Sequence, residues 1–176
     1  PFKGLNRLTH GLRRGEIVTF AAGSGVGKSH LCKIIAHNLL KTEHKVGYIA
    51  LEESLERTAN SIIGLEMQKL IHLDPEFQAT DEYNEAFKAT IGSGRCFLYD
   101  HWGSMESDNL LGHIRYMAKV MDVEYVVLDH LSIIVSGLGD GDERRLIDNT
   151  MTKLRSLVEE TNIGMILVSH LKRPEG

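Results

Sequence analysis

The stretch Ala22-Gly23-Ser24-Gly25-Val26-Gly27-Lys28-Ser29 joins an apolar run, Ile17–Ala22, to a segment with apolar residues at helical spacing, Lys28–Lys41. The first pattern predicts a strand and the second a helix. The closely spaced glycines between them let the backbone turn tightly, so that successive N–H groups point toward a bound phosphate. Strand, glycine-rich turn and helix in this order are the structural context of a P-loop. Ala22 stands where the pattern usually has a glycine, and alanine is tolerated there.

Each part of this predicted P-loop has a chemical role. The helix that begins after Gly27 adds the partial positive charge of its N-terminus to the phosphate site. The Lys28 side chain reaches the β- and γ-phosphates, and the Ser29 hydroxyl ligates Mg²⁺. The sequence therefore predicts ATP or another nucleoside triphosphate, together with Mg²⁺, as the cofactors. The predicted nucleotide-binding residues are Gly23, Ser24, Gly25, Val26, Gly27, Lys28, Ser29 and His30.

Strand and helix patterns alternate along the rest of the chain. This alternation predicts βαβ units, in which helices cover both faces of a mostly parallel sheet. The fold class is therefore α/β, in one domain covering residues 1–176. Further strands are predicted over residues 46–51, 96–99, 125–129 and 164–169. Further helices are predicted after the N-cap Ser54 and over residues 81–91, 108–121 and 143–161, with a short one starting at Pro75. In segment 108–121, the residues predicted to face the core are Leu111, Ile114, Met117 and Val120.

Acidic residues follow two of the predicted strands. Asp129 ends an apolar strand, which is the Walker B pattern, and it would hold the Mg²⁺ shell through water. Glu52 follows the strand after the P-loop helix, where a carboxylate can orient the water that attacks the γ-phosphate. Glu53 is the alternative to Glu52 for this role. A structural alternative is that both glutamates favour the positive end of the following helix.

His170 ends the last predicted strand, beside the strands that carry the P-loop and Asp129. A polar side chain there can hydrogen-bond the γ-phosphate and respond to its loss, so we expect His170 to take part in catalysis. The alternative is a histidine that faces solvent. Lys172 and Arg173 follow directly and could contact a phosphate backbone, or they could be ordinary solvated charges.

Composition restricts the class of protein. The 176 residues carry a formal net charge of −4, which argues mildly against strong nucleic-acid binding by a single protomer. The two cysteines, Cys32 and Cys96, have no CxxC spacing, so a reducing, cytoplasmic setting fits best. No apolar run approaches the ~20 residues that span a bilayer, and we expect no membrane association.

Taken together, the motifs resemble the RecA-like motor domain of replicative DNA helicases. The likeness is greatest to the primase–helicase of the T-odd bacteriophages, with the DnaB and mitochondrial Twinkle helicases as relatives. It covers nearly the whole chain and rests on segments 4–16, 23–29, 51–54, 128–133, 142–154 and 169–172. The P-loop is a general motif, whereas the stretch from Asp129 to Lys153 and the His-Leu-Lys ending are much more specific.

The resemblance implies an ATP-dependent replicative helicase that unwinds duplex DNA while it moves on single-stranded DNA. It implies a catalytic carboxylate at Glu52, a metal-serving acid at Asp129 and a γ-phosphate sensor at His170. It also implies a homo-hexameric ring, with primase and polymerase as further candidate partners. Two loops would face the DNA channel, and their candidate DNA-binding residues are Ser136, Gly137, Lys172 and Arg173.

In this family the second channel loop and the arginine finger lie beyond the position of Gly176. We therefore expect the domain to be truncated at its C-terminal end, and the fragment alone to be weak or inactive as a hydrolase. Two other readings share the P-loop, Glu52 and Asp129. One is a RecA- or KaiC-type recombinase or switch ATPase, and the other is a nucleotide-gated assembly module that does not unwind DNA.

Overall fold

The computed structural model describes residues 2–71, 75–100, 107–130 and 143–170. Within them the backbone forms a five-stranded sheet with the strand order β1-β5-β4-β2-β3, and all four strand pairs are parallel. The strands are β1 (Ile17–Ala22), β2 (Val46–Ala50), β3 (Cys96–Asp100), β4 (Tyr125–Asp129) and β5 (Gly164–His170). The predicted α/β class with a parallel sheet is therefore confirmed.

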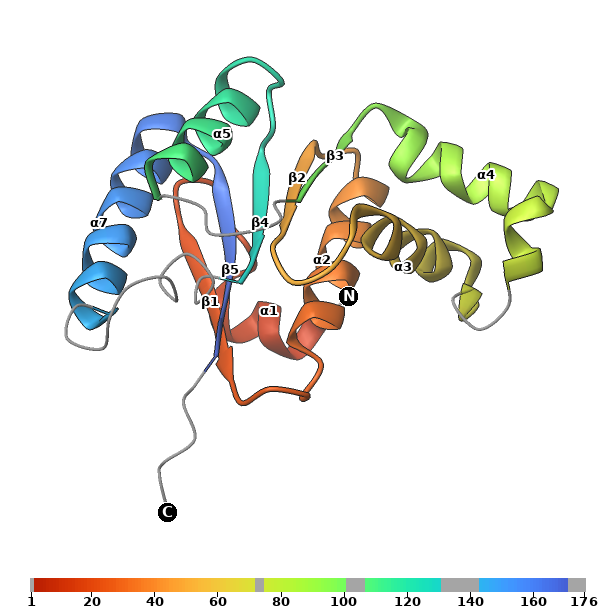
Figure 1. Cartoon of the computed structure of the whole chain (residues 1–176), viewed down its shortest axis with the longest axis horizontal. Coiled ribbons are helices and arrows are strands. Elements are labelled where there is room, and N and C mark those ends of the chain that lie inside the picture. Colours follow the sequence, from red (N-terminus) through yellow and green to blue (C-terminus); the bar gives the residue numbers. More distant parts are fainter. Residues whose placement is uncertain (1, 72–74, 101–106, 131–142, 171–176) are drawn as a thin grey trace.

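Helices lie on both sides of the sheet, as Figure 1 shows. They are α1 (Lys3–Thr9), α2 (Lys28–Lys41), α3 (Leu55–Met67), α4 (Asp81–Ala89), α5 (Ser107–Lys119) and α7 (Glu143–Thr161). Two short 3-10 turns, η2 (Pro75–Ala79) and η3 (Ile91–Ser93), flank α4. The sequence periods place β1, α2, β4 and α7 with the same bounds as the structure. The other elements for which both bounds were predicted differ by one or two residues at one or both ends.

The sheet separates two apolar clusters. On one face, α5 and α7 pack against strand residues such as Val126 and Leu167. On the other face, α2 and α3 pack against residues such as Tyr48 and Val127. Because successive strand residues point to opposite faces, a strand buried on both sides reads as a continuous apolar run. Strands β2 and β4 are buried at every position.

One predicted core residue is wrong. Helix α5 ends at Lys119, and the Val120 side chain beyond it is 61% exposed. The helical period was extrapolated past the point at which the chain leaves the helix. Ile114 and Met117 are buried as predicted, and Leu110, which the sequence analysis did not select, is fully buried on the same helix.

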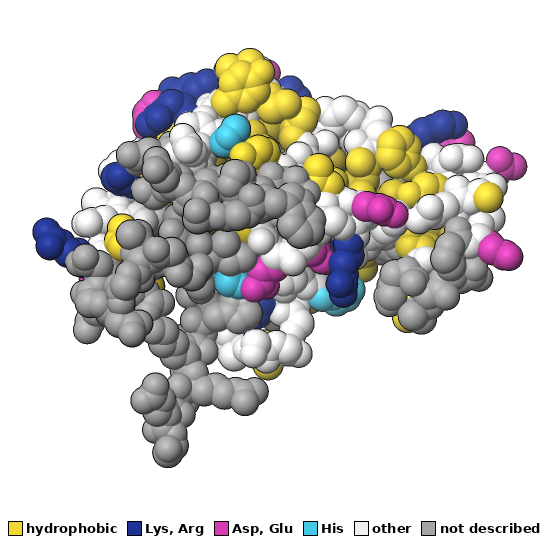
Figure 2. Space-filling model, viewed as in Figure 1, with side chains coloured by type: hydrophobic (Ala, Val, Ile, Leu, Met, Phe, Trp, Pro, Cys, Tyr) yellow, Lys and Arg dark blue, Asp and Glu magenta, His cyan; other side chains and the backbone are white. Residues whose placement is uncertain are grey.

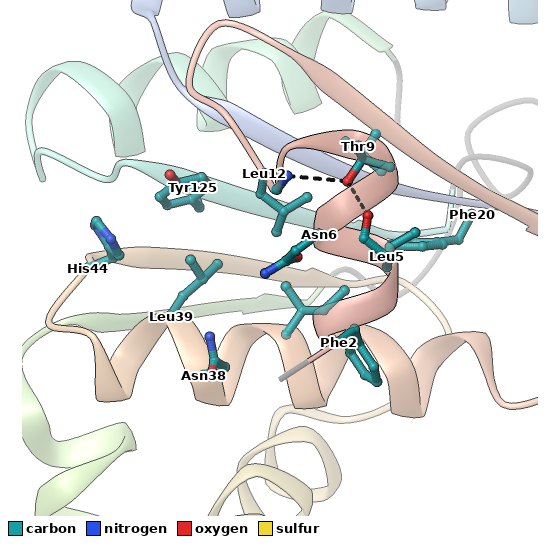
Figure 3. A pocket seen from close by; sticks show the side chains of 13 residues that line it. Phe2, Leu5, Asn6, Thr9, Leu12, Phe20, Asn38, Leu39, His44 and Tyr125 are labelled. Carbon is teal, nitrogen blue, oxygen red and sulfur yellow. Dashed lines mark hydrogen bonds between the residues drawn. The ribbon is translucent and has the colours of Figure 1, made fainter.

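Helix α1 covers an apolar cavity of about 330 Å³ whose other walls come from β1 and α2 (Figure 3). At the C-terminal end of this helix, the Thr9 hydroxyl donates to the Leu5 carbonyl (3.0 Å) and accepts from the Gly11 N–H (3.3 Å). His44 and Tyr125, which precede or begin a strand, line the same cavity. The cavity therefore lies toward the amino ends of β2 and β4, away from the P-loop.

No helix among the described residues is long and apolar enough to cross a membrane. Cys32 and Cys96 are free thiols in the apolar cluster under α2, and burial raises the pKa of each to about 12. Both therefore behave as small core residues rather than as reactive thiols.

Candidate nucleotide-binding and hydrolytic site

The predicted chemical residues meet at the carboxyl edge of the sheet. The P-loop follows β1, Glu52 follows β2, Asp129 ends β4, and the backbone of His170 ends β5. Strand β5 lies between β1 and β4, with His170 in register with Ala22. Ligands of open α/β sheets bind outside the carboxyl ends of the strands, so the fold places these residues where a ligand is expected.

The P-loop backbone has the conformation that its glycines permit. Gly25 and Gly27 have φ angles of 81° and 88°, in the left-handed region that favours glycine. No atom lies within 4 Å of where a Cβ would be at either position, so backbone conformation rather than space requires glycine. Gly27 is the N-cap of α2, and its carbonyl accepts the first helical hydrogen bond from the Leu31 N–H (2.9 Å).

Lys28 is held at the base of this loop. Its side chain is buried, and Nζ donates to the carbonyls of Ala22 (2.8 Å) and Gly23 (2.6 Å). These carbonyls sit where the chain passes from β1 into the loop. The ammonium group is therefore fixed within the concave side of the glycine-rich backbone, although most of that loop is exposed to solvent.

Asp129 is 3% exposed. The Tyr48 hydroxyl donates to its Oδ2 (3.2 Å), while Oδ1 is buried without a hydrogen bond of regular geometry among the described residues. Burial raises the pKa of Asp129, against the lowering influence of Ser29, Tyr48 and His130. A buried carboxylate that is only partly satisfied fits a cation, and the Ser29 side chain lies close enough to this carboxylate to act against the rise in its pKa.

These residues fit a bound Mg²⁺ ion better than a protein-only metal cage. No group of three or more His, Cys, Asp and Glu side chains within the described residues could hold a metal. One hydroxyl and one carboxylate match the way Mg²⁺ is bound beside phosphates, where water and phosphate oxygens supply the remaining ligands. Ser29 and Asp129 are the residues that would hold it.

Glu52 lies at the solvent side of the same edge, with its side chain 45% exposed. Its Oε1 contacts Nε2 of His130, which is buried and follows Asp129 directly. No sequence motif predicted a role for His130. Its position immediately after the Walker B acid is the signal that could have drawn attention to it, because that peptide leaves the strand at the ligand edge.

Glu53, the alternative hydrolytic carboxylate, is engaged elsewhere. Its Oε1 lies 2.6 Å from Lys33 Nζ and accepts from the Thr58 hydroxyl at 2.7 Å. The N-cap of α3 is Ser54, which accepts from the Arg57 N–H (3.3 Å), as predicted. Of the two acids, Glu52 is the one whose carboxylate faces the ligand edge.

Several predicted site residues remain untested by the structure. Ser136, Gly137, Lys172 and Arg173 lie outside the described residues, and the His170 side chain does as well. Ser24, Val26 and His30 are exposed around the P-loop. The exposed His30 also borders a hollow that is otherwise lined by residues of α3 and the segment after it, including Asn60 and Lys69.

Comparison with known proteins agrees with this arrangement. The family model for the DnaB-like helicase C-terminal domain matches residues 1–175. The chain belongs to this family. The DNA helicase/primase of Enterobacteria phage T3 is 38% identical over 178 residues, which cover 98% of this chain and 31% of that protein. The resemblance predicted from the motifs is therefore confirmed.

Other relatives and a solved structure extend the comparison. A probable plasmid replicative DNA helicase of Chlamydia trachomatis is 29% identical over 92% of this chain and 36% of its own length. The solved structure of another protein's ATPase domain, at 19% identity, superposes with a TM-score of 0.74 over 98% of this chain and 63% of that one. This likeness supports the RecA-like fold. The chain spans about a third of the length of the curated relatives it matches.

Proposed function

We propose that this domain is the ATP-hydrolysing motor of a replicative DNA helicase. The observation that carries the proposal is the convergence of Lys28, Ser29, Asp129 and Glu52 at one sheet edge. The family and the phage relative, named a DNA helicase/primase, support the same function. The nucleotide would be a nucleoside triphosphate with Mg²⁺, bound at the glycine-rich loop.

The chemistry assigns a separate task to each residue. The loop N–H groups and Lys28 would bind the phosphates, and Lys28 Nζ would exchange its carbonyl partners for phosphate oxygens. Glu52 would orient the attacking water and accept its proton as the new P–O bond forms and the bond to the leaving diphosphate breaks. Mg²⁺ held by Ser29 and Asp129 would neutralise charge on the β- and γ-phosphates.

The coupling of hydrolysis to movement is part of the same proposal. His170 ends β5, which lies between the strand that leads to the P-loop and the strand that ends in Asp129. A hydrogen bond from His170 to the γ-phosphate could therefore form when the phosphate is present and break when it is lost. Loss of that contact would shift neighbouring loops, as in other nucleotide switches. Assembly as a homo-hexamer, with primase and polymerase as partners, belongs to the proposal on the basis of the family.

Single-stranded DNA is the proposed polymer substrate. On the face drawn in Figure 2, the described Lys and Arg side chains are spread over the surface, and several of them lie beside acidic groups. That part of the surface is not a broad basic patch of the kind that binds nucleic acid alone. On the basis of the family, we propose that DNA contacts lie at Ser136, Gly137, Lys172 and Arg173, brought together by several subunits.

Nucleotide turnover by the complete protein tests this function. Glu52→Gln should keep nucleotide binding and lower kcat by ~10²–10⁴-fold, the usual contribution of a general base. Lys28→Ala should lose nucleotide affinity. The matched control for Glu52→Gln is Glu56→Gln, which makes the same change at an exposed acid in the first turn of α3. Unchanged turnover in Glu52→Gln would remove Glu52 from catalysis.

A strand-separation assay tests the helicase part. Wild-type protein should separate a forked DNA duplex when ATP is present, and Glu52→Gln should not. ATP-dependent filaments on DNA without strand separation would favour a recombinase. Nucleotide binding with no turnover in the wild type would favour an assembly module.

A further inference from the structure

The residue that follows the candidate hydrolytic carboxylate, Glu52, forms a buried ion pair. Lys33 on α2 and Glu53 after β2 place Nζ and Oε1 2.6 Å apart, with side chains only 7% and 15% exposed. Removing two charges from water is costly unless they are paired and hydrogen-bonded. A pair at this depth therefore constrains the two segments that carry it far more than a surface salt bridge would.

Additional hydrogen bonds surround the pair. The fully buried Thr58 donates its hydroxyl to Glu53 Oε1 (2.7 Å), and Arg57 Nε lies 3.6 Å from Oε2. Lys33 Nζ also lies 3.4 Å from the Ser61 hydroxyl. Glu53 is thus tied both to the P-loop helix and to the first turns of α3.

Glu52 sits between two anchored neighbours. On one side, the Leu51 N–H donates to the Asp129 carbonyl (2.8 Å), which extends the pairing of β2 with β4 by one residue. On the other side, Glu53 is held by Lys33. The backbone that carries Glu52 is therefore fixed from both directions, and its carboxylate rests against His130.

We propose that the Lys33–Glu53 ion pair is a positioning device that holds Glu52 at a fixed place relative to the P-loop. Lys33 lies five residues after Lys28 on the same helix, so the pair links the phosphate-binding end of α2 to the hydrolytic carboxylate. Neither residue contacts the reacting atoms, and both act through Glu52. This inference rests on the proposed hydrolytic role of Glu52.

The size of the effect follows from geometry. Displacing a catalytic group by about 1 Å can lower a rate by on the order of 10²-fold, while binding of the substrate elsewhere is little affected. Loss of the pair should therefore appear in kcat and leave nucleotide affinity nearly unchanged. If the pair served folding alone, its loss would lower stability without lowering kcat at unchanged nucleotide affinity.

The test compares Lys33→Met and Glu53→Gln in the complete protein. Each should lower kcat by ~10–100-fold and change the dissociation constant for Mg-ATP by less than ~3-fold. Lys33→Arg should retain most of the rate. Lys41→Met is the matched control, because Lys41 lies on the same helix, contacts Glu66 at 3.5 Å and is 58% exposed. It should leave kcat unchanged.

Two further variants separate positioning from stability. Leu157→Ala removes a buried side chain from α7, at a distance in sequence from the site, and should lower the melting temperature without lowering kcat. Where Lys33→Met does not fold, Thr58→Val removes one hydrogen bond to Glu53 at similar volume and should lower kcat several-fold. Wild-type kcat in Thr58→Val and Glu53→Gln would overturn the proposal.

The decisive experiment combines Lys33→Met with Glu52→Gln in one protein. If the pair acts through Glu52, adding Lys33→Met to Glu52→Gln should lower the residual turnover no further, because residues that act as one unit are not additive. Additive losses would overturn the positioning role. If Glu52→Gln alone retains wild-type turnover, the proposed hydrolytic role fails instead, so the two failures are distinguishable.

Discussion

The two ends of strand β4 carry acids in opposite environments. Glu124 precedes the strand and is surrounded by partners: His44 Nδ1 at 3.0 Å, the Lys45 N–H at 3.2 Å and Arg14 at 3.7 Å. Asp129 ends the strand, is more deeply buried, and has the Tyr48 hydroxyl at 3.2 Å. Burial acts to raise the pKa of both acids, but the partners of Glu124 outweigh it and lower that pKa, whereas the pKa of Asp129 stays raised.

The difference shows where the fold leaves a charge for a ligand to satisfy. At the amino edge of the sheet, groups within the chain stabilise the carboxylate. At the carboxyl edge, a buried carboxylate keeps an oxygen without a regular hydrogen bond among the described residues, at the place where the P-loop ends. Groups whose ionisation is disfavoured in this way gather at functional sites, because the bound ligand completes the arrangement. The free domain should therefore be less stable than the same fold without this charge.

Substitution at Asp129 should give the largest effect. Asp129→Asn removes the buried charge, so it should stabilise the nucleotide-free protein at neutral pH by on the order of 1 kcal/mol. It should also lower turnover by ~10²-fold or more, since the metal-binding carboxylate is lost. Thermal melting with and without Mg-ATP measures both consequences, because the added stabilisation by Mg-ATP should be largely lost.

The pH dependence gives a separate check on Asp129→Asn. An acid whose folded pKa is raised opposes folding above that pKa, and the cost disappears as the pH falls below the ordinary value of 3.8. The stability gain of Asp129→Asn should therefore be full at pH 7 and shrink in acid. A variant less stable than wild type at pH 7 would contradict this account of the carboxyl edge.

Removal of the Tyr48 hydroxyl should give the next largest effect. Tyr48 is fully buried and donates to Asp129, so Tyr48→Phe leaves that carboxylate with even fewer partners. Losing a buried hydrogen bond to a charged group should cost about 1–3 kcal/mol, measured by denaturant unfolding. Tyr116→Phe, at a 55% exposed position on α5, should change stability by less than ~0.5 kcal/mol. In the Asp129→Asn background the cost of Tyr48→Phe should shrink.

The sequence is most informative where local patterns act alone. The helix α2 is delimited by the glycine at its N-cap and by the end of its apolar spacing at Lys41, so its bounds follow from local chemistry. Strand β4 is a continuous apolar run that ends in an acid, and it is buried at every position. The carboxyl-edge placement of Glu52 and Asp129 then follows from parallel topology.

The contacts between segments could not be predicted in the same way. The Lys33–Glu53 pair joins residues 20 positions apart, and the Glu52–His130 contact joins residues 78 apart. Both depend on strand order, which places β4 beside β2 although α3, α4, β3 and α5 lie between them in the chain. Helix α1 was not predicted, because it has only 7 residues and none of them is buried. The Val120 error has the opposite cause, since a regular period continued beyond the end of the helix.

Glu124 should give the smallest effect, and it tests the other half of the comparison. Glu124→Gln keeps one acceptor oxygen, which the Lys45 N–H can use, but replaces the oxygen that faces His44 with an amide NH₂ group and removes the charge. For a partly exposed group it should cost about 1 kcal/mol of unfolding free energy. Because the folded pKa of Glu124 is lowered, its contribution is present above the ordinary value of 4.5 and is lost as the pH falls through the folded pKa. Wild type and Glu124→Gln should therefore differ at pH 7 and converge in acid, which is the reverse of the sign expected for Asp129→Asn. Chemical unfolding of both variants between pH 3 and pH 7 compares the two ends of β4 directly. Nucleotide turnover in Glu124→Gln should equal that of wild type, because the amino edge of the sheet takes no part in the chemistry.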